Sequence, residues 1–364
     1  MRFGHFIMGT REGSYQDIVE QVVLADGLGF DTTWLAERHF EHSDLLWPAP
    51  LVAAAYLAAK TDKIRIGLAA RILPFHNPID VAEEIATLDQ LSGGRVEVGF
   101  TRGGLDPKFH DVYGVSPEMS ASRFEESMDI LERAWRGETF SYEGEHFRYR
   151  DVCVRPLPVQ RPHPPITMVS NSPASMERSA ARGLPLFLNG IQDNDDLAIR
   201  HQSYVSLLRL FGHPPTPRYV LNRFIYVGES MQAARDTMRE PFMAFIRDHA
   251  PDLKMALERR YGAKSRDFEF LAEHVAIFGD AEHCIEKIRS LEQCVPFTEL
   301  MGTFNYLTLE HRACVDSMQR FAIEVIPALR SPNVTRLNAS FLPNTRRHSH
   351  ASPHATVHQL AASH

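Results

Sequence analysis

The chain has 364 residues, 44% of them hydrophobic and 23% charged, which is ordinary for a soluble globular protein. Its formal net charge of −7 argues against a nucleic-acid or membrane-surface partner. No apolar run approaches the roughly 18 residues of a transmembrane helix, and the N-terminus shows no signal-peptide pattern. The four cysteines have neither zinc-like spacing nor disulfide density, so we expect a cytoplasmic protein with reduced thiols.

Strand-like and helix-like segments alternate along residues 1–330. The predicted strands are residues 3–8, 32–35, 64–69, 96–100, 166–169, 185–188, 219–227 and 299–303. The predicted helices are residues 15–28, 50–60, 79–91, 119–136, 174–182, 195–211, 231–261, 281–291 and 309–329. Residues 139–156 have the pattern of a hairpin insertion, and residues 249–278 that of an insertion before the last strand. Eight strands that each precede a helix favour a (β/α)8 TIM barrel.

An open doubly wound sheet is the competing α/β architecture. It normally carries a Gly-rich dinucleotide fingerprint after its first strand, and residues 9–14 lack one. We therefore predict one barrel domain over residues 1–330. Residues 331–364 are a polar tail that we expect to be disordered, although five histidines among its last 17 residues also fit a metal-binding tract.

Residues 85–104 combine a helix end, a tight turn, a buried strand and a Gly-flanked arginine. Gly93 and Gly94 end the helix, and the following strand delivers Thr101 and Arg102 to its carboxyl end. Ligands of parallel α/β proteins bind at that end of the strands. A cation beside glycines suits a phosphate group, so we expect Arg102 to contact one.

The end of the fifth strand offers the best local anion site. Ser172 is placed to cap a helix that starts at Pro173, which would turn free backbone N–H groups toward the barrel mouth, with the Ser175 hydroxyl near them. Arg102 and Arg123 are the cations that would complete this site. The alternatives are simple helix capping by Ser172 and surface ion pairs for the two arginines.

Three polar residues, Glu37, Arg38 and His39, follow the second strand. A histidine titrates near neutrality, so this group would suit acid/base chemistry. The alternative is an ion pair between Glu37 and Arg38 at the barrel mouth, with His39 as a hydrogen-bonding residue. The other histidines show no metal-ligand spacing, which disfavours a metal-dependent barrel and predicts no metal site.

Taken together, these residues resemble the bacterial luciferase-like flavin monooxygenase family, and most closely its luciferase α chains. The likeness covers residues 1–329 and is densest in residues 30–40, 85–104 and 180–185. It implies a barrel that binds reduced FMN non-covalently. By position, the phosphate clamp would comprise Arg102, Arg123, Ser172 and Ser175. The wall around the flavin ring would comprise Phe6, Ala70, Val169, Ser170 and Asn171, with a non-proline cis peptide at Ala69-Ala70.

Two positions depart from the luciferase pattern. Arg38 stands where the luciferase α chain has its catalytic histidine, and Thr101 where the family has a reactive cysteine. Arginine cannot act as a base in a protein, but it could stabilise an anionic flavin or peroxide. Thr101 would hydrogen-bond the oxygenated flavin, and His39 or Arg38 would tune its charge. Because residues 249–278 are fewer than those of the luciferase active-site loop, efficient aldehyde-dependent light emission is not expected.

The resemblance implies a two-component monooxygenase. A separate flavin reductase would supply reduced FMN. The enzyme would then insert one atom of O2 into a small organic substrate, in specialised metabolism, through a flavin C4a-(hydro)peroxide. An F420-dependent oxidoreductase of the same fold and a non-catalytic partner subunit are the other hypotheses.

The resemblance also implies a homodimer packed through barrel helices. The helix at residues 79–91, with Glu83 and Glu84 among apolar residues, is the candidate interface. The alternative is an ordinary barrel helix whose acidic residues face water.

Overall fold

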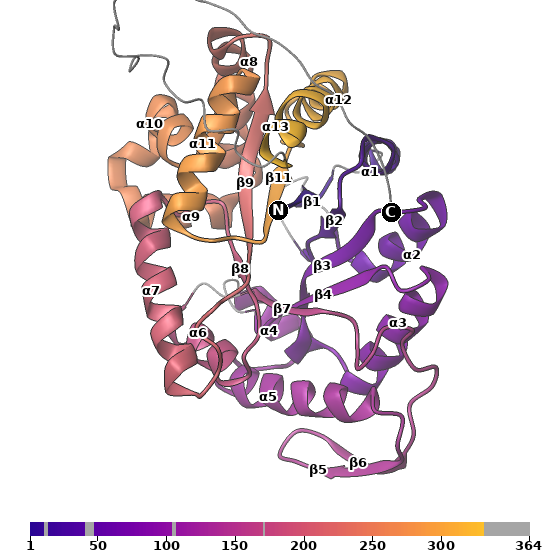
Figure 1. Ribbon diagram of the computed structural model, residues 1–364. Coiled ribbons are helices and arrows are strands. Elements are labelled where there is room, and N and C mark those ends of the chain that lie inside the picture. The colour runs from indigo at the N-terminus through magenta and orange to yellow at the C-terminus, as the bar shows by residue number, and fades with distance from the viewer. Residues whose placement is uncertain (11–13, 41–46, 104–106, 170–171, 331–364) are drawn as a thin grey trace, which may run out of the picture. The chain divides into compact units, whose positions relative to one another are not determined.

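A computed structural model describes residues 1–10, 14–40, 47–103, 107–169 and 172–330 (Figure 1). Residues 1–330 form one compact unit, and the predicted tail lies outside the described residues. The barrel strands, in their order around the ring, are β1 (Arg2–Ile7), β2 (Thr32–Leu35), β3 (Arg65–Ile72), β4 (Val96–Thr101), β7 (Ile166–Val169), β8 (Leu186–Leu188), β9 (Tyr219–Val227) and β11 (Glu299–Thr303). All eight pairings are parallel, and β11 pairs with β1, so the ring is closed. The expected (β/α)8 barrel is confirmed.

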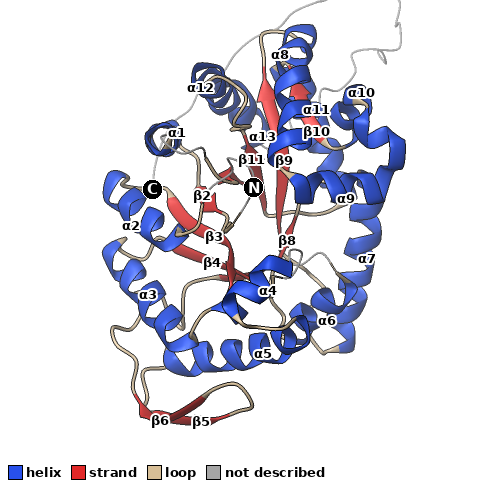
Figure 2. Cartoon of the chain, turned by 180° about the vertical axis from the view of Figure 1, so that it is seen from behind, coloured by secondary structure: helices blue, strands red, loops and turns tan. Residues whose placement is uncertain are grey.

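Helices surround the ring of strands (Figure 2). They are α1 (Tyr15–Leu28), α2 (Pro50–Lys60), α3 (Pro78–Leu91), α4 (Pro107–Tyr113), α5 (Pro117–Ala134), α6 (Pro173–Ala181), α7 (Asn194–Leu210), α8 (Met231–Ala244), α9 (Pro251–Tyr261), α10 (Phe268–His274), α11 (Ala281–Cys294), α12 (His311–Arg320) and α13 (Ile326–Arg330). Within the described residues, no helix combines the length and the apolar character needed to cross a membrane.

The insertions agree with the sequence in part. The predicted hairpin forms from β5 (Phe140–Glu143) and β6 (Arg148–Val152), beside α5 (Figure 1). The segment before the last barrel strand contains a strand that the sequence pattern did not reveal, β10 (Ala276–Gly279). It pairs with the second half of β9, outside the closed ring. The short helix α4 after β4 was not predicted either.

The barrel interior is filled differently at its two ends. At the amino ends of the strands, Arg2 forms ion pairs with Glu97 and Glu299. Above them Trp34 is fully buried and donates its indole N–H to Glu299 at 2.8 Å. A Cβ at Gly67 would overlap that indole ring, so the glycine leaves the space that Trp34 fills. This plug closes one end of the barrel and leaves the carboxyl ends of the strands for a ligand.

Candidate active site at the carboxyl ends of the barrel strands

A compact apolar layer lies at the carboxyl end of the barrel interior. Phe6 and Phe187 pack with their ring centroids 5.7 Å apart, and Ala69 and Val169 contact the same cluster. Ala69 is joined to Ala70 by a cis peptide bond, as the resemblance implies, and both alanines are buried. The strands β1, β3 and β7 therefore bring the predicted flavin-binding residues Phe6, Ala69, Ala70 and Val169 to one end of the barrel, and β8 adds Phe187.

Beside this layer, a buried carboxylate binds two histidines. Glu37 Oε1 accepts hydrogen bonds from His39 Nε2 at 2.9 Å and from His76 Nε2 at 2.8 Å. Arg71 Nη1 lies 3.2 Å from the same oxygen, and the backbone N–H of Ile72 donates to Oε2 at 3.0 Å. The ends of β2 and β3 thus supply one connected set of polar groups, which we call the Glu37 cluster (Glu37, His39, Arg71 and His76).

The Glu37 cluster keeps the Glu37 carboxylate ionised and fixes the orientation of the His39 ring. Burial alone would raise the pKa of Glu37, but the hydrogen bonds from His39 and His76 and the charge of Arg71 outweigh it, so the pKa lies well below its usual range. An ionised carboxylate can only accept hydrogen bonds, so His39 must donate its Nε2–H to Glu37. In a neutral imidazole the other nitrogen, Nδ1, then carries no proton and accepts a hydrogen bond. That nitrogen lies 3.3 Å from the Tyr113 hydroxyl, which completes a chain of hydrogen bonds.

An aromatic wall flanks His39. Phe75 stacks on Tyr113 with ring centroids 5.0 Å apart and on Phe109 at 6.0 Å, and Phe40 adjoins both α4 rings. The sequence identified Glu37 and His39 but missed Arg71, His76 and Tyr113 as members of the site. The signal for Arg71 and His76 was present, because both follow a predicted barrel strand, where ligands bind.

Arg38 and Thr101 occupy the two positions that depart from the luciferase pattern. The backbone N–H of Arg38 donates to the carbonyl of Trp47 at 3.1 Å, and the ion pair to Glu37 described above comes from Arg71. Thr101 is the last residue of β4, half-buried, and its hydroxyl accepts the N–H of Gly103 at 3.4 Å. Both residues therefore lie at the carboxyl ends of barrel strands.

One of the two predicted phosphate-binding arginines lies against the turn after β3. Arg123, in α5, donates Nε–H to the carbonyl of Pro74 at 2.6 Å, and its guanidinium lies 4.3 Å from the centre of the Phe147 ring. Burial lowers the pKa of Arg123. The turn and the β5–β6 hairpin thus position Arg123. Arg102 directly follows the carboxyl end of β4, and its neighbour Gly103 has positive φ and closely approaches Ile72 at the end of β3.

Ser172 caps α6, as the alternative interpretation held. Its hydroxyl accepts the backbone N–H of Ser175 at 3.2 Å, and the two serine hydroxyls lie 2.9 Å apart. Arg178, which the sequence analysis missed, donates to the Ser175 hydroxyl at 3.0 Å and lies 3.5 Å from Glu125 of α5. Capping and anion binding use the same N-terminus, so the cap leaves the second interpretation open. Ser170 and Asn171 lie outside the described residues.

These residues fit a flavin mononucleotide. The apolar layer and the two small alanines suit a flat ring, and the serine-capped helix with nearby arginines suits a phosphate. Arg71 adds a buried Nε–H donor that has no hydrogen-bond partner within the described residues. Buried donors without partners are rare, so this one suits a ring carbonyl or nitrogen of a ligand.

One group of side chains in the described part of the chain has metal-ligand spacing, namely Glu126, Glu145 and His146. Glu126 already accepts the backbone N–H groups of Glu145, His146 and Phe147 at 2.7 to 3.3 Å. Its carboxylate therefore holds the turn between β5 and β6.

Comparison with known proteins identifies the family. The sequence model described as luciferase-like monooxygenase matches residues 1–296. The chain belongs to this family. It is 31% identical over 219 residues to an alkanal monooxygenase alpha chain of Photorhabdus luminescens, covering 58% of this chain and 60% of that one. It is 25% identical to the oxygenase component of a flavin-dependent trigonelline monooxygenase of Acinetobacter baylyi, covering 93% and 99%. Two uncharacterized Sinorhizobium fredii proteins match over only about half of their own length, 56% and 49%.

Solved structures share the fold. The monooxygenase RslO1 of Streptomyces bottropensis has a TM-score of 0.79 at 24% identity, over 90% of this chain and 100% of that one. The FMN-bound oxygenating constituent of 3,6-diketocamphane monooxygenase from Pseudomonas putida has a TM-score of 0.77 at 20% identity, covering 90% and 98%. An F420-dependent secondary alcohol dehydrogenase has a TM-score of 0.72 at 18% identity, covering 91% and 99%. Proteins with this fold therefore use either FMN or F420, so the fold alone does not identify the cofactor of this chain.

Proposed function

We propose that this chain is the oxygenase component of a two-component monooxygenase, which uses reduced FMN and O2 to insert one oxygen atom into a small organic substrate. The observation that carries the proposal is an apolar layer that shares one barrel mouth with two arginines and a serine-capped helix. The relative named as an oxygenase component aligns over 93% of this chain and supports the two-component arrangement. A separate flavin reductase would supply the reduced FMN.

Each part of the cofactor has proposed partners in the barrel mouth. The phosphate would be held by Arg102, Arg123, Ser172 and Ser175. The ring would lie against Phe6, Ala69, Ala70 and Val169, with Ser170 and Asn171, outside the described residues, completing the wall. When bound, reduced FMN would supply the electrons that activate O2.

The protein's own residues would then control water and protons. The apolar layer would keep water from the ring and so limit the loss of activated oxygen as hydrogen peroxide. His39, which Glu37 fixes through Nε2, would exchange protons at Nδ1, on the side of Tyr113. Arg38 would stabilise negative charge, because a guanidinium does not deprotonate. Thr101 would donate a hydrogen bond to the reacting oxygen.

Rapid mixing tests the proposal directly. The protein is loaded with reduced FMN without oxygen and then mixed with oxygenated buffer. We expect a transient absorbance spectrum that differs from those of reduced and oxidised FMN. Immediate formation of oxidised FMN would overturn the monooxygenase proposal, and failure of the purified protein to bind flavin would favour a non-catalytic subunit.

Thr101 can be tested in the same experiment. Thr101→Val keeps the shape of the side chain and removes its hydroxyl, so we expect more hydrogen peroxide to be released per FMN oxidised. Thr33→Val is the matched control, because Thr33 is buried in β2 and its hydroxyl has no hydrogen-bond partner among the described residues. Equal peroxide release by the two variants would remove Thr101 from the proposed site.

An F420-dependent oxidoreductase is the second candidate, because solved structures with this fold use that deazaflavin. Binding of reduced FMN and of F420 to the purified protein would be compared by fluorescence titration. Tighter binding of F420, together with hydride transfer to it from an alcohol, would favour this second function.

We also propose a homodimer, packed through the exposed faces of α2 and α3. On α2, Val52 and Tyr56 are 73% and 50% exposed, and on α3 Leu91 is 71% exposed. Glu84 of α3 forms an ion pair with Arg71 at 3.5 Å, so this helix also contacts the Glu37 cluster. Analytical ultracentrifugation of the protein and of Val52→Glu tests this interface, since a buried charge in the variant would favour the monomer.

A further inference from the structure

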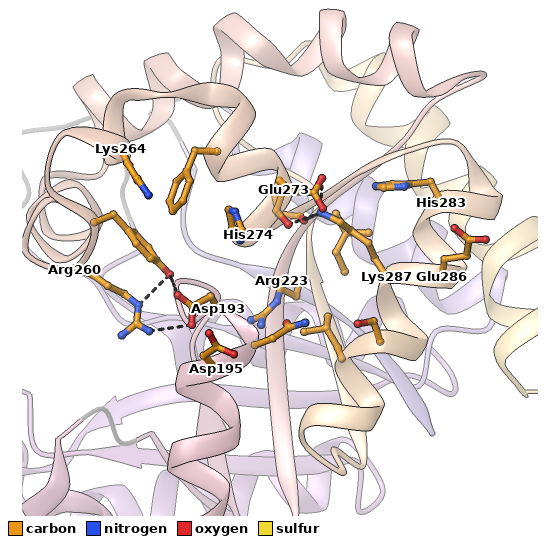
Figure 3. A pocket seen from close by; sticks show the side chains of 17 residues that line it. Asp193, Asp195, Arg223, Arg260, Lys264, Glu273, His274, His283, Glu286 and Lys287 are labelled. Atoms are coloured by element: carbon orange, nitrogen blue, oxygen red, sulfur yellow. Dashed lines mark hydrogen bonds and ion pairs between the residues drawn. The ribbon is translucent and has the colours of Figure 1, made fainter.

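A second cavity lies outside the barrel, between α7 and α11 (Figure 3). Its volume is about 890 Å³, within the range of small-molecule sites. We call it the outer pocket. Its lining includes the charged residues Asp193, Arg223, Arg260, Lys264, Glu273 and Lys287. None of them belongs to the proposed flavin site. The insertion that carries α9, α10 and β10 supplies most of one wall.

Arg223 is an unusual residue for its position in β9. Its neighbours Val220 and Asn222 face the barrel interior, where Val220 joins the apolar layer and Asn222 donates to Thr303 at 3.0 Å. Side chains alternate along a strand, so Arg223 faces the helices, where barrel strands usually present apolar residues. It is only 2% exposed, and Figure 3 shows it between Asp193 and Lys287.

The charge of Arg223 has no ion-pair partner within the described residues, and Asp193 acts on it only from beyond ion-pair distance. Its guanidinium donates to the carbonyls of Asn222 and Gln192, both at 2.9 Å, and forms no ion pair with a described carboxylate. Burial lowers its pKa to about 10. A buried cation that has only carbonyl partners is costly, and an anion placed beside it would recover part of that cost.

Two of the four carboxylates that line the outer pocket are already engaged. Asp193 caps α7 and also binds Arg260 and the Tyr261 hydroxyl, each at 3.2 Å. Glu273 pairs with Arg235 at 3.2 Å and lies 3.7 Å from Lys287. The other two, Asp195 and Glu286 (Figure 3), form no ion pair within the described residues, and none of the four pairs with Arg223.

Further positive charge lies around the outer pocket. Lys287 donates to the carbonyls of Ala272 and Glu273 at 2.9 and 2.6 Å, at the end of α10. Lys264 is exposed at the edge, with its amine 5.3 Å from the centre of the Phe270 ring.

We propose that the outer pocket binds a small anionic molecule with carboxylate or phosphate groups, anchored by Arg223 and assisted by Lys264. The guanidinium is suited to both groups, because each offers two oxygens to its fork of donors. The proposal does not rest on FMN binding, since it uses none of the residues assigned to the flavin.

Isothermal titration of the full chain with citrate, and separately with pyrophosphate, tests the proposal and distinguishes the two anion classes. We expect millimolar or tighter binding of at least one probe that is weakened by added salt. Arg223→Gln should weaken that binding about 10- to 100-fold, and Lys264→Gln about 3- to 10-fold. Arg259→Gln is the matched control, because Arg259 is exposed on the same helix as Arg260 but does not line the cavity.

Three outcomes would overturn the proposal. One is that neither probe binds. Another is that Arg223→Gln and Lys264→Gln both bind the probe as tightly as the unaltered chain. The last is that FMN displaces the probe, which would place the anion at the barrel mouth instead. If Arg223→Gln fails to fold, Lys264→Gln decides, since Lys264 is exposed and its replacement leaves the packing intact.

Discussion

Two buried charges in this barrel differ in whether the protein supplies a neutralising partner. At the barrel mouth, Glu37 has Arg71 and two histidines within hydrogen-bond distance, and its pKa is held well below its ordinary value. In the outer pocket, Arg223 has backbone carbonyls alone, and burial lowers its pKa. The first charge is fully compensated by the protein. The second is not, and this difference separates a group that positions the proposed catalytic side chains from one that is suited to an incoming ion.

The largest expected effect comes from removing the compensated charge. Glu37→Gln would leave Arg71 without its buried counter-charge, and the new amide NH2 would face either the two histidines or the Ile72 N–H, all of which donate to Glu37. We expect a loss of about 3–5 kcal/mol in the free energy of unfolding, measured by urea denaturation. Glu84→Gln is the control, because Glu84 is 48% exposed and contacts Arg71 at 3.5 Å, so its loss should cost less than about 1 kcal/mol. Equal losses for the two variants would mean that Glu37 stabilises the fold no more than a half-exposed carboxylate does.

The charge of Glu37 also makes the free energy of unfolding depend on pH in acid. The folded-state pKa of Glu37 is lowered from 4.5, so its stabilising contribution is complete above pH 4.5 and is lost as the pH falls below that value. In Glu37→Gln this part of the acid dependence should disappear. A variant that keeps the full slope below pH 4.5 would show that other carboxylates cause it.

A third buried titratable group, His5, sharpens the comparison because its ring has no polar partner among the described residues. It is fully buried against Phe304, neither ring nitrogen has a hydrogen-bond partner within the described residues, and burial lowers its pKa from 6.5 to about 4. As the pH falls, His5 therefore takes up a proton at a higher pH in the unfolded chain than in the folded chain, which favours unfolding. We expect about 3 kcal/mol of stability to be lost between pH 6.5 and pH 4.

His5→Leu provides the test of that expectation. The leucine does not titrate and suits an apolar site, so the free energy of unfolding should vary much less over the same pH interval. Denaturant titrations at several pH values measure this. If His5→Leu and the unaltered chain lose equal stability, His5 does not stay neutral in the fold.

Much of the fold was predictable because it depends on local patterns. Each barrel strand was found within one residue at either end except β3, which runs three residues beyond its predicted end, since a buried parallel strand is a short apolar run between turn signals. β10 was missed because Ala276–Gly279 is short and lies inside a segment rich in helical patterns. α4 has only seven residues, too few for a helical period to show clearly.

The site was less predictable, because its contacts join distant segments. Glu37 and His39 could be found from their place after a strand, but Tyr113 reaches His39 from 74 residues away. The side of β9 that Arg223 occupies follows only from the register, which the sequence pattern alone does not fix. Local signals therefore identify strand ends, and the closed barrel decides which strand ends meet.

Two arginines distinguish the barrel mouth from the outer pocket. Arg123→Gln should weaken FMN binding about 10- to 100-fold, since a charge-assisted contact to the phosphate is lost. Arg223→Gln should leave the FMN dissociation constant unchanged, because Arg223 lies on the helix side of β9. Fluorescence titration of FMN measures both. A similar loss in the two variants would mean that the outer pocket and the flavin site are coupled.

The smallest expected effect decides between the two interpretations of Ser172. Ser172→Ala removes the cap of α6 and should cost about 1 kcal/mol of stability whether or not a phosphate binds there. Ser172→Asp is more informative, because aspartate caps a helix as well as serine but adds a negative charge. Its stability should match that of the unaltered chain, while its affinity for FMN should fall through repulsion of the phosphate. Unchanged FMN affinity in Ser172→Asp would assign Ser172 to capping alone and would leave phosphate binding to the arginines.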